Sequence, residues 1–188
     1  MKRIFACLLF AALSSSAARA EIIGMQVPRA VSEEEMKASL RQVDLVDEKG
    51  APLNLNGLIG DGKPTLVTLW AHWCANCRAE VSGFKAIANA CPNRWNVVFV
   101  SARRNDYPKD VAAFKSFGLP WKFYNVAKSA QSDVSKARVA RAFYGATADG
   151  GIVTPLHYFV SSTGVIEAIV NGRMDFTEPQ RLAAFCEK

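Results

Sequence analysis

Along the chain, segments with the apolar spacing of strands alternate with segments that have the apolar spacing of helices. The runs 65–70 and 97–100 are apolar and rich in β-branched residues, which predicts strands covered on both faces. Further strands are predicted at 122–126, 156–160 and 165–170, and helices at 78–90, 110–117, 132–144 and 177–186. This order, which closes with a hairpin and a helix, predicts an α/β fold with a mixed central sheet flanked by helices on both faces.

Polar residues mark the ends of two of the helices. Ser32 and Glu35 have the spacing of a capping box, which predicts a short helix that ends near Leu40. Ser132 is the expected N-cap of a later helix, and Gly145 is expected to stop it. Local side-chain chemistry therefore predicts where both helices begin.

The chain after the first helix is predicted to form a β-hairpin. Apolar and polar residues alternate over 41–46, and a turn leads into a second short strand at 52–55. Neither an internal repeat nor a linker follows. We therefore expect an N-terminal extension with a short helix over 21–40 and one domain over 41–188.

The first residues have the pattern of an export signal. Lys2 and Arg3 precede an apolar run over 4–13, and small residues lead up to Ala20. A membrane span needs about 20 apolar residues, roughly twice the length of this run. We expect residues 1–20 to be a cleaved secretory signal peptide and the mature protein to be periplasmic.

Composition excludes a disordered chain, since 50% of the 188 residues are hydrophobic and 21% are charged. Removal of the signal peptide halves the formal charge of +6, because it takes three of the 23 basic residues and none of the 17 acidic ones. The other basic residues are scattered without interleaved aromatic residues, so nucleic acid is not an expected partner. Cys7 leaves with the signal peptide. The remaining cysteines, Cys74, Cys77, Cys91 and Cys186, enter a compartment where disulfides persist.

Cys74 and Cys77 stand two residues apart, where a buried strand ends and a helix begins. A cysteine at a helix N-terminus meets free N–H groups, which favour the thiolate over the thiol. The second cysteine lies about one turn further along, within reach of a disulfide with the first. Thiol–disulfide exchange needs this arrangement, because a thiolate attacks the substrate disulfide and a nearby thiol resolves the mixed disulfide.

The segment 70–80, WAHWCANCRAE, resembles the active-site segment of the thioredoxin superfamily. It is most similar to the periplasmic TlpA/ResA-type proteins, whose motif is W-A-x-W-C-x-P-C-R-x-E, and the likeness extends from about Arg41 to Cys186. The resemblance implies a thioredoxin fold with an N-terminal β-hairpin extension. It also implies a thiol–disulfide oxidoreductase in which Cys74 is the nucleophile and Cys77 the resolving thiol.

The same resemblance implies a substrate-binding surface around the cysteines. Pro155 is expected to be a cis proline that faces them, and Thr154 is expected to offer backbone contacts to an extended substrate segment. Trp73 is expected to shield Cys74 and to present an apolar surface to partner proteins; a plain packing role is the alternative.

The chain departs from the family pattern at three positions. Asn76 replaces the usual proline between the cysteines, and Val153 replaces a glycine that often precedes the cis proline by two residues. Thr68 stands where thioredoxins proper carry a buried carboxylate, so that proton relay is absent or served by another group. Arg78 and Glu80 are interpreted as solvated charges on the helix face, with Arg78 adding positive potential near the thiolate.

In the implied fold, the helices that end at Cys91 and Cys186 pack on the same side of the sheet. We therefore expect a structural disulfide between these two cysteines, with two separate buried thiols as the alternative. Such a bond closes a long loop, which stabilises by roughly 4–5 kcal/mol in the chain-entropy model.

The resemblance suggests a reductant of protein clients that is fed by a membrane electron donor of the DsbD/CcdA type, although an oxidant role stays open. We expect a monomer that needs no cofactor and holds no metal. The alternative from another class is a copper- or zinc-binding module that uses Cys74, Cys77 and either His72 or His157.

Overall fold

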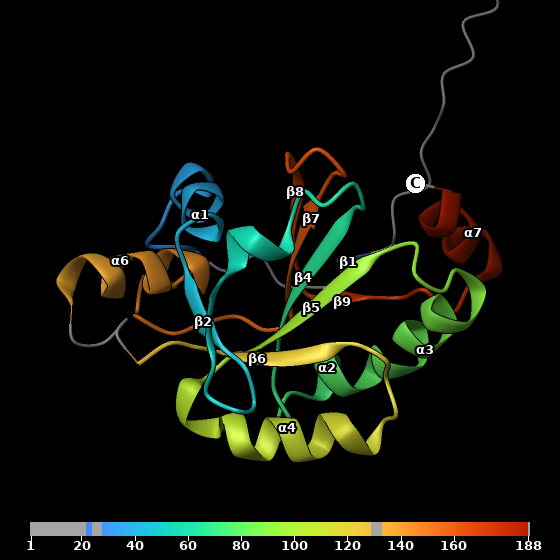
Figure 1. Ribbon diagram of the computed structural model, residues 1–188, viewed down its shortest axis with the longest axis horizontal. Coiled ribbons are helices and arrows are strands. Elements are labelled where there is room, and N and C mark those ends of the chain that lie inside the picture. Colours follow the sequence, from blue (N-terminus) through green and yellow to red (C-terminus); the bar gives the residue numbers. More distant parts are fainter. Residues whose placement is uncertain (1–21, 24–27, 129–132, 188) are drawn as a thin grey trace, which may run out of the picture.

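The structure, a computed structural model, describes residues 22–23, 28–128 and 133–187 (Figure 1). The predicted signal peptide over 1–20 and the expected N-cap Ser132 lie outside these residues. Within the described part of the chain, no helix has the length and apolar character needed to cross a membrane.

A mixed seven-stranded sheet forms the centre of the molecule. Its strands are β2 (Asp44–Val46), β3 (Pro52–Asn54), β4 (Thr65–Trp70), β5 (Asn96–Ser101), β6 (Lys122–Val126), β7 (Leu156–Val160) and β8 (Ile166–Asn171). Their spatial order is β3-β2-β6-β5-β4-β7-β8. The central pairs β4–β5 and β5–β6 are parallel, and the flanking pairs are antiparallel. The predicted N-terminal hairpin is therefore present as β2–β3.

Helices cover both faces of this sheet. One face carries α1 (Glu33–Leu40) and α6 (Val134–Phe143); the other carries α2 (Ala75–Ala79), α3 (Val81–Ala90), α4 (Tyr107–Ser116) and α7 (Pro179–Glu187). Figure 1 shows α1 beside α6 and α3 beside α7. Short 3-10 turns follow β3 (η1, Leu55–Leu58) and precede α4 (η2, Arg104–Asp106), and a small separate pair joins β1 (Ile22–Ile23) to β9 (Arg173–Met174).

Alternate side chains of β4 enter two different hydrophobic clusters. Leu66 and Trp70 pack under α2, α3 and α4, whereas Val67 and Leu69 pack under α1 and α6. Every residue of β4 is buried, as its continuous apolar sequence predicts. Because its side chains alternate, Thr68 lies on the same face as Leu66 and Trp70.

The helix starts confirm one local prediction and correct another. The Ser32 hydroxyl accepts from the Glu35 N–H, and the Glu35 carboxylate accepts from the Ser32 N–H, so the capping box is formed. The N-cap of α6 is Asp133 rather than Ser132, since its carboxylate accepts from the N–H groups of residues 135 and 136 at 2.8 and 3.1 Å. A carboxylate and a hydroxyl are both good caps, so the sequence alone did not separate these neighbours.

The helix predicted at 78–90 is in fact two helices, α2 and α3, which meet at Glu80. It begins earlier than predicted because Cys74 caps it. The helix predicted from residue 110 likewise begins at Tyr107, with Pro108 in its first turn. The last helix begins at Pro179, two residues later than predicted.

Candidate active site

The cysteine pair lies at the end of β4, where the chain turns into α2. Cys74 is the N-cap of α2, and its sulfur accepts from the Cys77 N–H at 3.2 Å. The two residues form a disulfide with their Cα atoms 5.3 Å apart. The indole N–H of Trp70 donates to the Cys77 carbonyl at 2.9 Å, which fixes α2 to the end of the strand.

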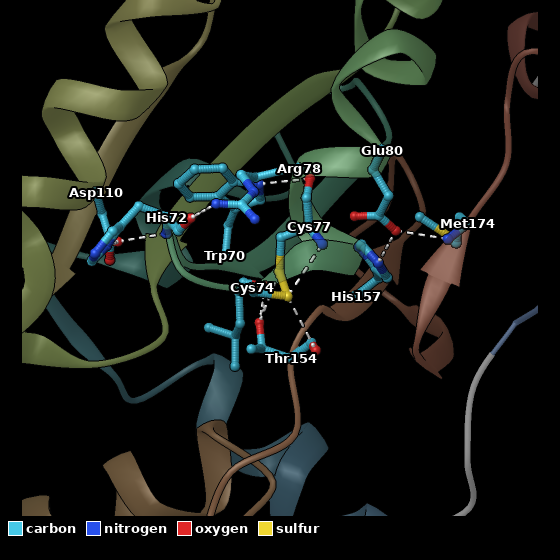
Figure 2. Close-up of a disulfide and its surroundings, with 11 residues drawn as sticks. Trp70, His72, Cys74, Cys77, Arg78, Glu80, Asp110, Thr154, His157 and Met174 are labelled. Carbon is cyan, nitrogen blue, oxygen red and sulfur yellow. Dashed lines mark hydrogen bonds and ion pairs between the residues drawn. A yellow bond between two sulfur atoms is a disulfide. The ribbon is translucent and has the colours of Figure 1, made fainter.

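The loop before β7 faces both sulfurs (Figure 2). The Thr154–Pro155 peptide bond is cis, as the family resemblance predicts. The Thr154 carbonyl oxygen lies 3.5 Å from the Cys74 sulfur, and the Thr154 hydroxyl oxygen lies 3.4 Å from the Cys77 sulfur. That hydroxyl donates to the Leu69 carbonyl at 2.9 Å, which ties the loop to β4.

Access to the pair is from the Cys74 side. Cys77 is fully buried, whereas Cys74 is 6% exposed and its neighbour Trp73 is 38% exposed. The Trp73 indole N–H donates to the Asp106 carboxylate at 2.9 Å, and the Arg103 guanidinium lies 4.5 Å from the ring centroid. A partner that approaches the disulfide therefore meets an exposed indole held in place from α4 and the loop before it.

His72 belongs to a network that turns away from the disulfide. Asp110, fully buried, accepts at Oδ1 from the His72 backbone N–H at 2.8 Å and lies 2.6 Å from the His72 ring nitrogen Nδ1. Its Oδ2 accepts from the Ser101 hydroxyl at 2.5 Å. Figure 2 shows the His72 ring pointing to Asp110, on the opposite side of the disulfide from His157.

Two tyrosines close to this network are held in the neutral phenol form. Burial raises the pKa of Tyr107 to about 12, and its hydroxyl donates to the Phe123 carbonyl at 3.1 Å. Burial also raises the pKa of Tyr144, whose hydroxyl donates to the Ser101 carbonyl at 3.4 Å.

A second carboxylate–histidine pair lies on the Cys77 side, and it is fully enclosed. Glu80 is 1% exposed and His157 is 0% exposed. Glu80 Oε1 lies 3.0 Å from His157 Nε2 and accepts from the Met174 N–H at 2.7 Å, while His157 Nδ1 lies 3.2 Å from the Thr68 hydroxyl. Oε2 of Glu80 is buried without a hydrogen-bond partner among the described residues.

The burial of Glu80 shows that its interpretation as a solvated charge on the helix face is wrong. It follows Cys77 by three residues, which places the two on one helix face, and that face turns to the sheet. The signal was present in the sequence, because Cys77, Val81 and Phe84 define a buried stripe that includes Glu80. Thr68, where thioredoxins proper carry a carboxylate, instead contacts His157, which is bonded to the carboxylate of Glu80.

Neither histidine is brought to the cysteine pair as a metal ligand. His72 is bonded to Asp110 and His157 to Glu80. In the described part of the chain, no group of three or more His, Cys, Asp and Glu side chains is placed to hold a metal ion. The geometry therefore does not favour the metal-binding alternative.

Cys91 and Cys186 lie at the other end of this helical layer. Cys91 is the C-cap of α3, and Cys186 lies in the last turn of α7. They form a disulfide with their Cα atoms 5.6 Å apart. Beside it, Trp95 stacks on Phe185 with ring centroids 4.2 Å apart.

Comparison with solved structures identifies the architecture. The thioredoxin domain of a thiol-disulfide oxidoreductase from Bacteroides vulgatus is 22% identical, with a TM-score of 0.54 over 77% of this chain and 90% of that one. A thiol:disulfide interchange protein from Chlorobium tepidum is 18% identical, with a TM-score of 0.52 over 88% and 99%. The fold is therefore the α/β thioredoxin-like fold.

A third structure adds to this likeness. It is a secreted disulfide oxidoreductase from Mycobacterium tuberculosis, described as homologous to E. coli DsbE, and it is 25% identical, with a TM-score of 0.50 over 81% of this chain and 99% of that one. A search of curated proteins gave no significant match.

Fold and cysteine pair define the class, a thioredoxin-like protein with a C-x-x-C disulfide at the end of β4. The model of the AhpC/TSA family matches residues 35–169, and the chain belongs to that family. It is a thiol–disulfide oxidoreductase of the TlpA/DsbE type, with Cys74 and Cys77 as the C-x-x-C pair.

Proposed function

We propose that the protein is a periplasmic reductant of protein disulfides, with Cys74 as nucleophile and Cys77 as resolving thiol. The observation that carries the assignment of the two cysteines is the asymmetry of the pair. Cys74 reaches the surface and accepts an N–H from the first turn of α2, whereas Cys77 is enclosed. An N–H donor at the sulfur stabilises a thiolate, and the thiolate is the attacking species.

The exchange proceeds in two displacements. The Cys74 thiolate attacks one sulfur of the client disulfide, which forms a mixed disulfide and releases the other client sulfur as a thiolate. The Cys77 thiol then loses its proton and attacks the Cys74 sulfur. The Cys74–Cys77 bond forms, the bond to the client breaks, and the client leaves with both of its sulfurs reduced.

Glu80 is the proposed acceptor of the Cys77 proton. It lies one helical turn from Cys77, and its Oε2 has no other partner among the described residues. A buried thiol has no water to take its proton, so a nearby carboxylate with a spare oxygen lowers the barrier to the second displacement.

Client binding is assigned to Trp73, Thr154 and Pro155. The indole offers an apolar contact beside the Cys74 sulfur, and the Thr154 carbonyl and hydroxyl face the two sulfurs. An extended client segment placed between them brings its own sulfur to Cys74.

The compartment and electron donor follow from the sequence pattern and the relatives. An export signal over residues 1–20 and a relative described as secreted both support a periplasmic location. A reductant in that compartment needs electrons from outside it, so we assign a membrane donor of the DsbD/CcdA type. Protein clients bearing disulfides are the proposed substrates, and the protein acts as a monomer.

Trapping and a redox titration test this function. Cys74→Ser is expected to abolish exchange, and Cys77→Ser is expected to accumulate clients as mixed disulfides on Cys74. Equilibration of residues 21–188 with glutathione is expected to give a potential near that of thioredoxin, roughly −270 mV. A potential near that of DsbA, roughly −120 mV, would show an oxidant instead.

We also propose that Cys91–Cys186 is a permanent structural disulfide. Its sequence separation of 95 residues gives the closed loop a large entropic effect on the unfolded chain. Replacement of both cysteines by serine is expected to lower the free energy of unfolding by about 4 kcal/mol. Alkylation of Cys91 in the unreduced native protein, detected by mass spectrometry, would contradict the proposal.

A further inference from the structure

We propose that His157 is a positioning residue for the second displacement, in which it holds the Glu80 carboxylate oriented toward Cys77. This inference rests on the proposed function, because it assigns Cys77 as the resolving thiol. It concerns a histidine on β7 that is distant in sequence from the cysteine motif and joins the site only through the sheet.

The position of His157 follows from the strand register. His157 pairs directly with Thr68 across β4 and β7, on the face that α2 and α3 cover. Its ring therefore lies beneath the helix pair that carries Cys77 and Glu80. Figure 2 shows the His157 ring and the Glu80 carboxylate together on the Cys77 side of the disulfide.

Both ring nitrogens of His157 have a hydrogen-bond partner. Nδ1 lies 3.2 Å from the Thr68 hydroxyl, and Nε2, which donates when it carries a proton, lies 3.0 Å from Glu80 Oε1. Among the described residues, Glu80 is the ionisable side chain that is hydrogen-bonded to His157. On the neighbouring strand β8 the residue opposite His157 is Val170. The Met174 N–H on β9 donates to Glu80.

The two hydrogen-bond donors of the Glu80 carboxylate both contact the same oxygen. Oε1 receives both His157 Nε2–H and Met174 N–H, whereas Oε2 receives neither. In Figure 2 the free oxygen points back toward Cys77. Two donors on Oε1 fix the orientation of the carboxylate, so the His157 contact keeps Oε2 on the side from which it can accept a proton.

Removal of this donor has a predictable effect on the chemistry. His157→Leu leaves Glu80 Oε1 with the Met174 N–H as its remaining donor among the described residues, so the carboxylate is less firmly held and its other oxygen is less well placed to take the proton of Cys77. His157→Gln retains an N–H at nearly the position of Nε2 and is expected to restore the function. The first displacement is at Cys74, which His157 does not contact, and is expected to be unchanged.

Stopped-flow reaction of the reduced protein with dithiobis(nitrobenzoate) separates the two displacements. The first nitrothiobenzoate is released by attack of Cys74 and depends on reagent concentration; the second is released by Cys77 and does not. We expect His157→Leu to slow the second release about tenfold and to leave the first within twofold. His157→Gln should recover most of the rate, and His72→Asn, the matched control at the other histidine, should alter neither phase.

A purely structural role for His157 would leave the second release as slow in His157→Gln as in His157→Leu, and that result would overturn the proposal. So would a second phase in His157→Leu that matches the wild type. If the leucine variant does not fold, Thr68→Val decides instead, since loss of the hydroxyl is expected to slow only the second release severalfold, and an unchanged rate refutes the role. A wild-type protein that releases the first product but never the second would instead contradict the proposed function of Cys77.

Discussion

The chain has two histidines, and each is bonded to a buried carboxylate on a different side of the disulfide. The Asp110 carboxylate uses both of its oxygens, with His72 on Oδ1 and Ser101 on Oδ2. Among the residues that the structure describes, the Glu80 carboxylate has hydrogen-bond partners at Oε1 alone. His72 is also 29% exposed at its side chain, whereas His157 is wholly enclosed.

The two pairs show how a carboxylate with a structural role differs from one that can accept a proton. A carboxylate whose oxygens are all occupied stabilises the turn that it joins and has no site left for another proton. A buried carboxylate oxygen without a hydrogen-bond partner destabilises the folded state, so its presence points to a role in the reaction. Beside a resolving thiol, such an oxygen can accept the proton of the thiol. The pair at His72 therefore anchors the motif, and we assign the pair at His157 to the reaction.

Of the two carboxylate–histidine pairs, the pair at Asp110 is expected to contribute more to stability. Asp110→Ala leaves the His72 N–H without its acceptor and removes one of the two acceptors of the Ser101 hydroxyl, which keeps the Arg103 carbonyl at 2.8 Å. We expect a loss of about 3 kcal/mol in the free energy of unfolding, measured by urea titration of the oxidised protein. Lys109→Ala, an exposed neighbour on α4, is the control and should change the free energy of unfolding by less than about 0.5 kcal/mol. A loss below about 1 kcal/mol for Asp110→Ala would show that this network does not hold the motif.

A smaller effect is expected at His72 itself. His72→Ala removes one donor to Asp110 but leaves the backbone N–H and Ser101 in place, so the loss should be about 1.5 kcal/mol. The rates of both displacements should stay within twofold of the wild type, because the His72 ring points away from the sulfurs. Slowing of the Cys77 phase would mean that the two histidine pairs do not differ as assigned.

The smallest effect at neutral pH is expected on the opposite face of β7. Tyr158 follows His157 in the strand, packs in the other hydrophobic cluster, and donates to the Phe143 carbonyl at 2.5 Å. Tyr158→Phe should cost about 1 kcal/mol and should leave the exchange kinetics unchanged.

The same residue gives a signed pH dependence. Burial raises the pKa of Tyr158, so the folded state favours the neutral phenol more than the unfolded chain does. That contribution is complete below the ordinary tyrosine value of about 10 and is lost as the pH rises above it. The melting temperature should therefore fall as the pH rises above about 10, and less steeply in Tyr158→Phe. Equal slopes for the two proteins would exclude Tyr158 as a source of the alkaline loss.

Much of the fold was accessible from local pattern. The continuous apolar run of β4 predicts burial on both faces, and Ser32 with Glu35 predicts the start of α1; both are confirmed because they depend on residues close in sequence. The helix predicted from residue 78 begins at Ala75, because the sulfur of Cys74 caps it and cysteine is not a usual capping residue. Boundaries of this kind depend on single hydrogen bonds, which periodicity does not register.

The order of strands and helices, the C-x-x-C pair at a strand end and the proline expected to face it could all be predicted from spacing along the chain. The surroundings of that pair could not, because they depend on how the elements pack. His157 is 77 residues from Glu80, and His72 is 38 residues from Asp110, so the sheet register and the packing of α4 bring them together. A charge on a helix looks the same in sequence whether it meets water or a buried imidazole, and only the packed fold distinguishes the two.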